Sequence, residues 1–368
     1  MTTSPDPIRA VTAERPELTY AALASSGSLV WSDHHRMWIA AHPDVVRTVL
    51  EGTDFLVRPR VGRVPEPLAG TRAGEIFGRL VRMNDGHEHA RMKRAISSAF
   101  DAVDPVTVRD AARYAAKQGV SQTPDERYPF MVSAFALGAL YGVPEDAQLG
   151  FAMLASDFAG CLAPGAGDVE IAAGIRAAED LWSVMSDVVA EDLAGPLVEA
   201  MRTAFARERL GHGALIANLI GFTFQAHDAV AGLIGSTIVR LSRASTAPDI
   251  PIARAIRTTL AAEPPIQNTR RFAARDTVVA GQQVKAGDAV LVVLAAGSDQ
   301  TGPACPFGRG RHECPGASLA LTIAEEAVGE VVRRWGLLTL PEGGVTYRPS
   351  ANARIPMLDV APSRERML

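Results

Sequence analysis

Cys314 is the residue whose type and surroundings point most directly to chemistry. It lies in the glycine-rich run FGRGRHECPG, residues 307–316, two residues after His312 and beside two arginines. Pro315 fits the first position of a helix, because its missing N–H would have no helical partner there. The sequence therefore predicts Cys314 at a helix N-terminus, where free N–H groups and the arginine charges would lower the pKa of the thiol. A soft thiolate held in this way suits iron.

The alternative is a buried cysteine in an ordinary turn, which is the commoner fate of a lone cysteine. Three glycines of the run favour a cofactor instead, because backbone without side chains can pack against something large and flat. These are Gly308, Gly310 and Gly316. The remaining cysteines, Cys161 and Cys305, are too few and too scattered for a disulfide framework. For Cys305 we expect a spectator rather than a second functional thiol.

The run F-G-x-G-x-H-x-C-x-G, continued by small and apolar residues at 317–320, resembles the haem-ligand loop of the cytochrome P450 superfamily. The resemblance implies that Cys314 is the axial ligand of the iron in heme b (iron protoporphyrin IX). It also implies that His312 contacts a haem propionate. The flanking cofactor-binding positions would be Phe307, Gly308 and Gly316.

Two further segments are similar to parts of the family that bind the propionates. Residues 85–100 are similar to its helix C. The resemblance implies that His89 and Lys93, which share a helical face at i, i+4 spacing, contact the propionates. The family usually has arginine where Lys93 stands, and lysine lacks the fork geometry. A solvated basic helix face is the alternative for this segment. The strand predicted over 269–273 is similar to the family strand whose arginine binds a propionate, and the resemblance assigns that role to Arg271.

The long apolar helix predicted from Ala214 to Leu241 is similar to the family's distal helix, with one departure. Asp228 matches the acid of the usual acid–alcohol pair, Ala229 stands in the place of the alcohol, and Gln225 in that of a glycine. We expect Asp228 to be buried rather than on the surface. Because alanine cannot hold a water chain, three alternatives stay open. The substrate supplies the hydroxyl, Gln225 or water fills the gap, or the reaction needs no dioxygen activation.

The structural Glu-x-x-Arg pair of the family is also missing. Residues 258–261 (TTLA) occupy its frame, before Glu263 and two prolines. The third member of this ion network in the family is an arginine in the segment before the haem loop. It is absent as well, because that segment is shortened to residues 295–306 between the last strand and Phe307. Removing one member of a buried ion network costs about 3–5 kcal/mol, whereas removing all of them can be nearly neutral. We therefore interpret the joint loss as a consistent variant of the family's structure, one that still binds haem.

Apolar periodicity and turn residues predict the remaining elements. Residues 57–82 are expected to form a long loop with a short helical piece. The resemblance implies that this loop covers the substrate and that the helices of 150–210 form the roof of the active site. The predicted elements are strands at 28–31 and 37–40, a helix from His42, a buried helix over 128–141 ended by Gly142, helices through 150–210 with breaks at 163–167 and 195–196, and a small sheet from 277–283 and 286–293.

Composition limits the class of protein. The chain has 368 residues, of which 47% are hydrophobic and 21% charged, and no linker divides it, so we expect a single domain over 1–368. The net charge of −4 argues against nucleic-acid binding. No apolar run long enough to span a membrane and no signal peptide is evident, so we expect a cytoplasmic protein. The resemblance implies a fold that is mostly α with small β-sheets, the cytochrome P450 fold, with haem between a long central helix and the cysteine loop.

By resemblance the function is oxidation of a small organic molecule by a haem-thiolate monooxygenase. A tailoring step in secondary metabolism, by oxygen insertion or oxidative rearrangement, is typical of such bacterial members. Electrons would come from a ferredoxin-type partner, docked on Arg91, Arg309 and Arg311 unless these are ordinary solvated surface. The sequence does not identify the substrate. A carrier protein that presents the substrate is an alternative to a free small molecule.

Two other functions remain open. The missing alcohol at Ala229 suggests haem-thiolate chemistry other than monooxygenation: peroxide-driven, dehydrating or nitrogen-centred. The missing ion network would instead fit a P450-like auxiliary protein that binds another enzyme. The intact cysteine loop argues against that role, because a scaffold has no need of a thiolate.

Overall fold

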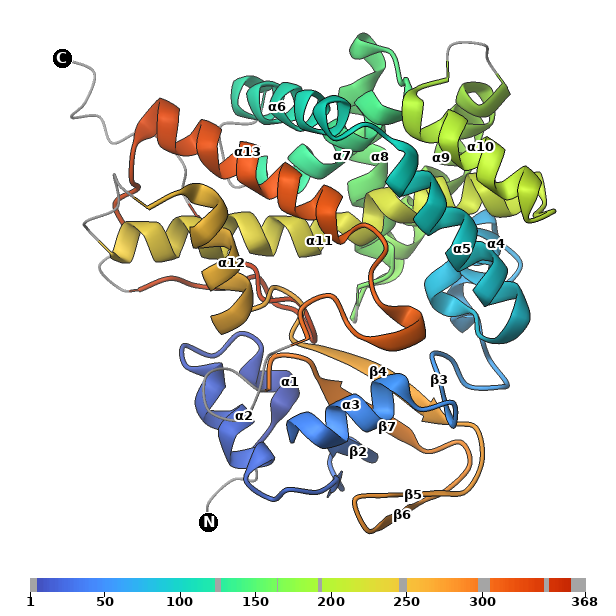
Figure 1. Ribbon diagram of the computed structural model, residues 1–368, viewed down its shortest axis with the longest axis vertical. Helices are drawn as coiled ribbons and strands as arrows, with labels where there is room; N and C mark the ends of the chain where they lie inside the picture. The colour runs from blue at the N-terminus through green and yellow to red at the C-terminus, as the bar shows by residue number, and fades with distance from the viewer. Residues whose placement is uncertain are drawn as a thin grey trace.

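The chain forms a large helical part and a smaller part that contains most of the strands (Figure 1). The computed structural model describes residues 5–122, 127–163, 165–190, 194–244, 250–296, 305–340 and 344–358. Among these residues the helices are α1 (Pro7–Ala10), α2 (Pro16–Ala24), α3 (Pro43–Glu51), α4 (Arg72–Arg79), α5 (Gly86–Ala102), α6 (Pro105–Gln122), α7 (Tyr128–Tyr141), α8 (Gln148–Cys161), α9 (Asp168–Ala190), α10 (Pro196–Arg207), α11 (His212–Arg243), α12 (Ile252–Ala262) and α13 (Ala317–Trp335). Short 3-10 helices are η1 (Glu66–Leu68), η2 (Val81–Met83), η3 (Glu145–Ala147) and η5 (Gly310–His312).

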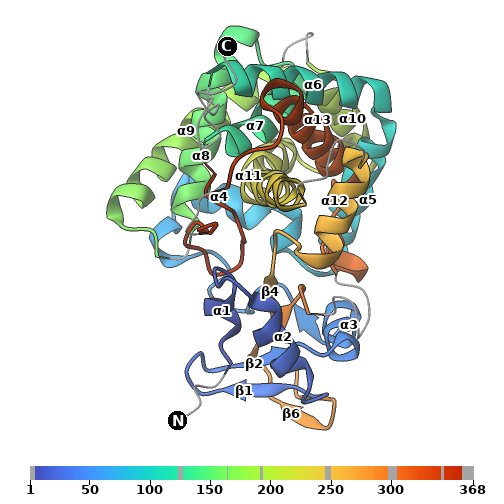
Figure 2. The same cartoon turned by 90° about the vertical axis from the view of Figure 1, so that its left-hand side faces the viewer.

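Helix α11 is the centre of the helical part, as its apolar sequence predicts. It packs against α4, α7, α8, α9, α12 and α13, and the turned view of Figure 2 shows it nearly end-on among the other helices. A helix that is apolar on most faces needs such a surround. Buried polar groups fix its position, since Tyr141 Oη donates to Leu219 O over 2.7 Å.

The predicted helix ends are largely confirmed. Pro43 begins α3, and the His42 side chain accepts a hydrogen bond from Asp44 N. Gly142 ends α7 with φ of 87°, a conformation that favours glycine. The short helical piece predicted within 57–82 is α4, and the 3-10 helices η1 and η2 lie on either side of it. Thr71 caps α4 by accepting from Gly74 N over 3.2 Å, and the buried residues of α4 pack on α11.

The larger sheet is five-stranded, with the order β1-β2-β7-β4-β3. The strands are β1 (Val30–Ser32), β2 (Met37–Ala40), β3 (Phe55–Leu56), β4 (Asn268–Ala273) and β7 (Ala289–Val293), with β5 (Thr277–Val279) and β6 (Gln282–Val284) in a separate hairpin. Strands β2 and β7 are parallel, and the other neighbours are antiparallel.

The prediction of one small sheet from 277–283 and 286–293 was wrong in its pairing. Residues 277–284 pair with each other as the β5–β6 hairpin, while β7 lies between β2 and β4. The reason is the composition of β7, AVLVV, which is buried over nearly its whole length. A strand that is apolar on both faces is stable only inside a sheet.

Two expectations can be compared only with the residues that the structure describes. Most of the shortened segment 295–306 lies outside them, since 297–304 is not described. Among the described helices, none combines the length and the hydrophobicity that a membrane-spanning segment requires.

Candidate active site

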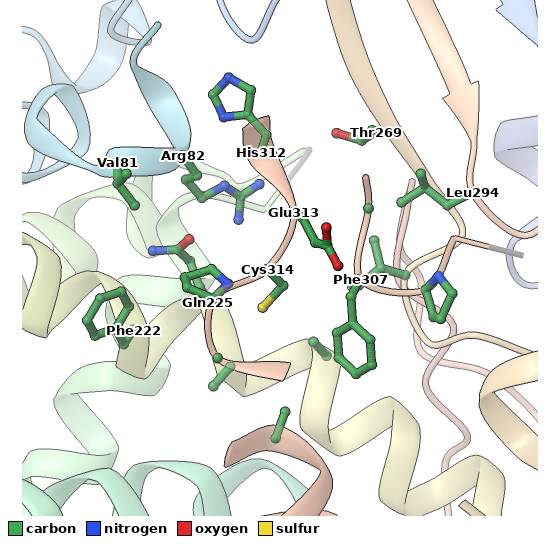
Figure 3. Close-up of a pocket in the computed structure, with 18 of the residues that line it drawn as sticks. Val81, Arg82, Phe222, Gln225, Thr269, Leu294, Phe307, His312, Glu313 and Cys314 are labelled. Atoms are coloured by element: carbon green, nitrogen blue, oxygen red, sulfur yellow. The ribbon is translucent and has the colours of Figure 1, made fainter. Parts of the chain in front are cut away.

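A cavity of about 430 Å³ lies between α11 and the loop that carries Cys314 (Figure 3). Its wall takes residues from both parts of the molecule, because β4 and the β7 end contribute as well as the helices. The lining includes Val57, Arg58, Val81, Arg82, Met83, His89, Lys93, Phe100, Phe222, Gln225, Ala226, Ala229, Thr269, Arg270, Arg271, Leu294, Phe307, Gly308, His312, Glu313, Cys314, Gly316, Leu319 and Ala320. Aliphatic and aromatic side chains, such as Val81, Phe222 and Leu319, make up most of the rest of the wall.

The Cys314 side chain projects into this cavity from a tight loop (Figure 3). Cys314 N donates to Phe307 O over 2.8 Å, and Gly308 N donates to Cys305 O over 2.9 Å. Gly308 adopts a φ of 70°, which closes the turn without the strain that a Cβ would bring. Cys305 is half-buried and is not among the lining residues, as expected for a spectator thiol.

The helix after the loop begins later than predicted. Helix α13 starts at Ala317 with Gly316 as its N-cap, so Pro315 lies in the preceding turn and not at the first helical position. The thiol accepts a hydrogen bond from the Gly316 backbone N–H instead. Burial raises the pKa of Cys314, although this bond and the charges of Lys93 and Arg82 act in the opposite direction. The expectation of a lowered pKa in the protein alone was therefore wrong.

The predicted role of the two loop arginines was also wrong. Arg309 pairs with Glu51 of α3 at 2.6 Å. Arg311 donates to Gly52 O over 2.9 Å and to Phe55 O. Both side chains fasten the loop to α3 and to the segment after it, so the cations beside the thiol come from other elements.

The four predicted propionate-binding residues gather at one side of the cavity. The rings of His89 and His312 lie 4.1 Å apart between centroids. Lys93 Nζ donates to Glu313 O, which joins α5 to the cysteine loop. Arg271 is buried, and burial lowers its pKa to about 10, so it stays charged at neutral pH. Burial, with the charge of His312, lowers the pKa of His89 to about 4, so that ring is neutral.

The residues predicted on α11 fall into two groups. Gln225 and Ala229 line the cavity, as expected. Asp228 does not: its carboxylate lies 2.8 Å from His227 Nδ1 and 3.1 Å from Arg348 Nη1, and its side chain is 40% exposed. The expectation of a buried Asp228 is met only in part, because a helix turns by about 100° per residue and carries this side chain past the face of Ala229 to a half-buried position. A direct contact between Asp228 and a substrate is not supported by this position.

The frame of the missing Glu-x-x-Arg pair contains no buried ion pair. Thr258 is exposed, and the buried Thr259 donates from Oγ1 to Ala255 O over 2.9 Å. The nearby carboxylate of Glu263 pairs with the buried Arg354. Arg354 also donates to Val11 O over 2.8 Å, so this ion pair connects the end of α12 to the N-terminal segment and to the C-terminal strand-like region.

Sequence reasoning missed three arginines of the cavity wall: Arg58, Arg82 and Arg270. A signal was present for Arg82, which is a single charge within the run Leu80-Val-Arg-Met before α5. Buried apolar runs rarely contain an unpaired charge without a function. The positions of Arg58 and Arg270 depend on the tertiary contact of the 57–82 segment with β4.

The residues that are present fit heme b. A soft sulfur donor faces a largely apolar cavity, cations lie along its wall, and small residues of α11 and α13 line it as well. Gly308 and Gly316 line the cavity, whereas Gly310 packs on α3, where a Cβ would lie 3.3 Å from Glu51 Cα. This fold and this set of donors define a haem-dependent oxidoreductase.

Comparisons with known proteins lead to the same class. The chain is 24% identical over 353 residues to cytochrome P450 CYP105Q4 of Mycobacterium marinum, covering 84% of this chain and 82% of the relative. It is 26% identical over 338 residues to mycinamicin IV hydroxylase/epoxidase of Micromonospora griseorubida, covering 81% of each. No family model matches the chain.

Solved structures share the fold over nearly the whole chain. Epothilone B-bound cytochrome P450epoK superposes with a TM-score of 0.81 at 19% identity, covering 99% of this chain and 100% of that one. P450BioI, crystallised with an acyl carrier protein ligated to hexadec-9Z-enoic acid, gives a TM-score of 0.78 at 18% identity, covering 93% and 97%. The chain therefore has the cytochrome P450 fold, and the relatives aligned over most of its length are cytochrome P450s.

Proposed function

We propose that this protein oxidises a small organic molecule in a tailoring step, by oxygen insertion or oxidative rearrangement, with Cys314 as the iron ligand. The single observation that carries the proposal is the Cys314 side chain facing, opposite α11, the cavity whose wall is largely apolar with cations along it. When bound, haem with a thiolate ligand supplies the capacity to activate dioxygen or peroxide. The names of the relatives, a mycinamicin hydroxylase/epoxidase and an epothilone epoxidase, support a tailoring step.

In this proposal the protein holds the cofactor by charge and shape. His89, Lys93, Arg271 and His312 bind the two propionates, since all four lie on the cavity wall. Lys93 also fixes the cysteine loop through Glu313 O. Apolar side chains of α11 and α13 exclude water from the cavity, which strengthens the electrostatic contacts. The chain then acts as one domain, because the wall draws on both of its parts.

Electrons come from a separate ferredoxin-type protein in this proposal, but the arginines predicted to dock it have other contacts. Arg91 donates to the carbonyl oxygens of Glu208 and Arg209. Arg309 and Arg311 hold the cysteine loop, as described above. The P450BioI structure contains an acyl carrier protein, which supports a carrier-presented substrate as an alternative to a free one.

The first experiment tests the ligand. The reduced wild-type protein with carbon monoxide should give the red-shifted Soret band of a cysteinate-ligated haem. Cys314→Ser should lose that band, while the matched control Cys305→Ser should keep it, because Cys305 does not line the cavity. A Cys314→Ser protein that retains the wild-type spectrum and turnover would exclude the proposal.

One observation favours a second candidate, peroxide-driven oxidation. Ala229 lines the cavity without a hydroxyl, and Gln225 donates from Nε2 to Gly221 O over 2.7 Å, within its own helix. Product formation with hydrogen peroxide should then exceed that with a reductase and dioxygen. Ala229→Thr should shift the balance toward dioxygen, because the hydroxyl can donate and accept hydrogen bonds in the cavity. Equal yields from both routes in both proteins would argue against this candidate.

A further inference from the structure

The cavity wall has a strong excess of positive charge. Its lysine and arginine side chains are Arg58, Arg82, Lys93, Arg270 and Arg271, whereas its only carboxylate among the described residues is Glu313. Glu313 lies beside Lys93, whose pKa its charge acts to raise. The excess therefore falls on the arginines.

The two propionates of haem do not account for all of these cations. The proposed function assigns Lys93 and Arg271 to the propionates, together with two histidines. Lys93 and Arg271 already match two negative charges. Arg58, Arg82 and Arg270 remain on the wall without a carboxylate partner there, and an anionic ligand in the cavity would offset their charge.

Arg82 is the first of the three remaining arginines. Figure 3 shows its guanidinium pointing into the pocket, on the side where Gln225 and Cys314 lie. Within the described residues, its side chain has neither a hydrogen bond nor an ion pair. Burial and the charge of Arg58 lower the pKa of Arg82, whereas the charge of the nearby Cys314 acts to raise it.

The backbone that carries Arg82 is fixed before any ligand arrives. Val81 N donates to Asn218 Oδ1 of α11 over 2.8 Å, and Asn218 Nδ2 donates to Arg79 O over 3.0 Å. On the other side, Asn84 Nδ2 donates to Leu80 O over 2.8 Å. A cation on such a support is preorganised, so less ordering entropy is lost when it binds an anion.

Arg58 and Arg270 approach the same space from two other elements. Arg58 Nε donates to Arg63 O over 2.9 Å, and its guanidinium lies 4.8 Å from the centre of the Phe77 ring. This contact leaves the terminal amino groups of Arg58 for a ligand. Arg270 lies on β4, and its charge lowers the pKa of Arg58, which puts the two cations near each other. No acceptor for the Arg270 side chain is found in the described part of the chain.

We propose that the substrate is a small carboxylic acid with an apolar body, and that Arg82, with Arg58 and Arg270, binds its carboxylate. This inference rests on the proposed function, because it assigns the substrate class of the same site. Planar guanidinium forks match a carboxylate in a bidentate geometry. The apolar remainder of the wall, including Val57, Val81 and Phe222, is suited to the body of the molecule.

The experiment compares matched ligands on the holoenzyme. The probes are the straight-chain acids from octanoate to hexadecanoate and a set of arylpropionates, each with its primary amide. Isothermal calorimetry and the ligand-induced change in the haem spectrum give the affinities. Wild-type protein should bind the best acid roughly tenfold more tightly than its amide, which is the scale of one charge-assisted contact.

Variants locate the anion site. Arg82→Gln and Arg270→Gln should each weaken binding of the best acid by roughly tenfold and leave that of its amide unchanged. Arg60→Gln is the matched control, since Arg60 belongs to the same segment as Arg58 and is exposed, yet does not line the cavity. The control should retain the acid preference of the wild type.

Several outcomes would overturn the inference. Acids and amides that bind equally, or acids that fail to bind across the series, would exclude a carboxylate site. Tighter binding of dodecyl phosphate than of dodecanoate would assign the arginines to a phosphate group. A lower ratio of haem to protein in Arg82→Gln, with an unchanged acid preference, would assign Arg82 to a propionate.

These readouts are separate from those of the proposed function. Calorimetry needs neither electrons nor dioxygen, so a protein that does not turn over can still show the acid preference. Loss of the proposed function would appear in the carbon monoxide spectrum of the wild type. A protein with the normal spectrum but no acid preference would overturn only the substrate class.

Discussion

His312 and Asp85 form a hydrogen bond, with His312 Nε2 2.9 Å from Asp85 Oδ1. The other oxygen of Asp85 accepts from Val57 N over 2.9 Å. One carboxylate just before α5 therefore joins the cysteine loop to the segment that follows β3. Burial acts to raise the pKa of Asp85, but the bond from His312 and its other contacts hold that pKa below its usual value. The carboxylate is thus ionised at neutral pH.

Asp85→Ala should lower the free energy of unfolding by about 1–3 kcal/mol, because it leaves a buried ring N–H and a backbone N–H without an acceptor. It should also lower the ratio of bound haem to protein, since the cysteine loop loses its contact with Val57. Urea unfolding at pH 7 and the haem absorbance measure the two effects. Asp101→Ala, an exposed carboxylate on α5, is the control and should change neither. A wild-type stability and haem content in Asp85→Ala would contradict this role.

Gly310 gives a second prediction about the cysteine loop. Its φ is 70°, and an added Cβ would lie 3.3 Å from Glu51 Cα. Gly310→Ala should therefore cost about 1–2 kcal/mol for the left-handed conformation and more for the contact with α3. Gly27→Ala isolates the first effect, because Gly27 has a φ of 65° and no atom within 4 Å of an added Cβ. Equal losses in urea unfolding would show that the approach to α3 is unimportant.

The ion pair between Arg354 and Glu263 yields a third prediction. Arg354 is 1% exposed and also donates to Val11 O and Ala13 O, over 2.8 and 2.7 Å. Arg354→Met should lower the free energy of unfolding by about 3–5 kcal/mol, because Glu263 and the two carbonyl groups lose their partner.

A double-mutant cycle separates the ion pair from the carbonyl contacts. Adding Glu263→Gln to Arg354→Met should cost less than Glu263→Gln alone costs in the wild type, because the unpaired charge is removed. Strictly additive free energies in urea unfolding would mean that the pair contributes nothing beyond its separate members.

Asp228 predicts a pH dependence. Burial acts to raise its pKa, but the hydrogen bond and charge of His227 and the charge of Arg348 hold it below its usual value of 3.8. A lowered pKa in the folded state adds stability that is fully present above the unfolded pKa and is lost as pH falls through the folded one. Because the side chain is partly exposed, the contribution should be only ~0.5–1 kcal/mol.

Asp228→Asn should accordingly be less stable than the wild type at pH 7, and the difference should shrink below about pH 4. Arg348→Gln should remove part of the same dependence, since it deletes one of the interacting charges. Urea unfolding between pH 3 and 7 measures both. A difference between wild type and Asp228→Asn that is the same at every pH would exclude the contribution.

The sequence alone was sufficient for the class of protein and for the main elements. The cysteine loop, the helix-C segment and the central helix are local patterns, because their residues lie within a few turns of one another. Helix ends at Pro43 and Gly142 follow from backbone preferences of single residues. These features need no knowledge of what packs against them, so they could be predicted.

Only the tertiary structure decided the charges around the cavity. Arg309 and Arg311, which are near Cys314 in sequence, turn to α3 and its following segment, whereas Lys93 and Arg82 reach the thiol from other elements. Likewise, Asp228 leaves the cavity face for Arg348, and β7 lies between β2 and β4. The physical reason is that burial and charge pairing depend on long-range contacts, which local periodicity does not specify.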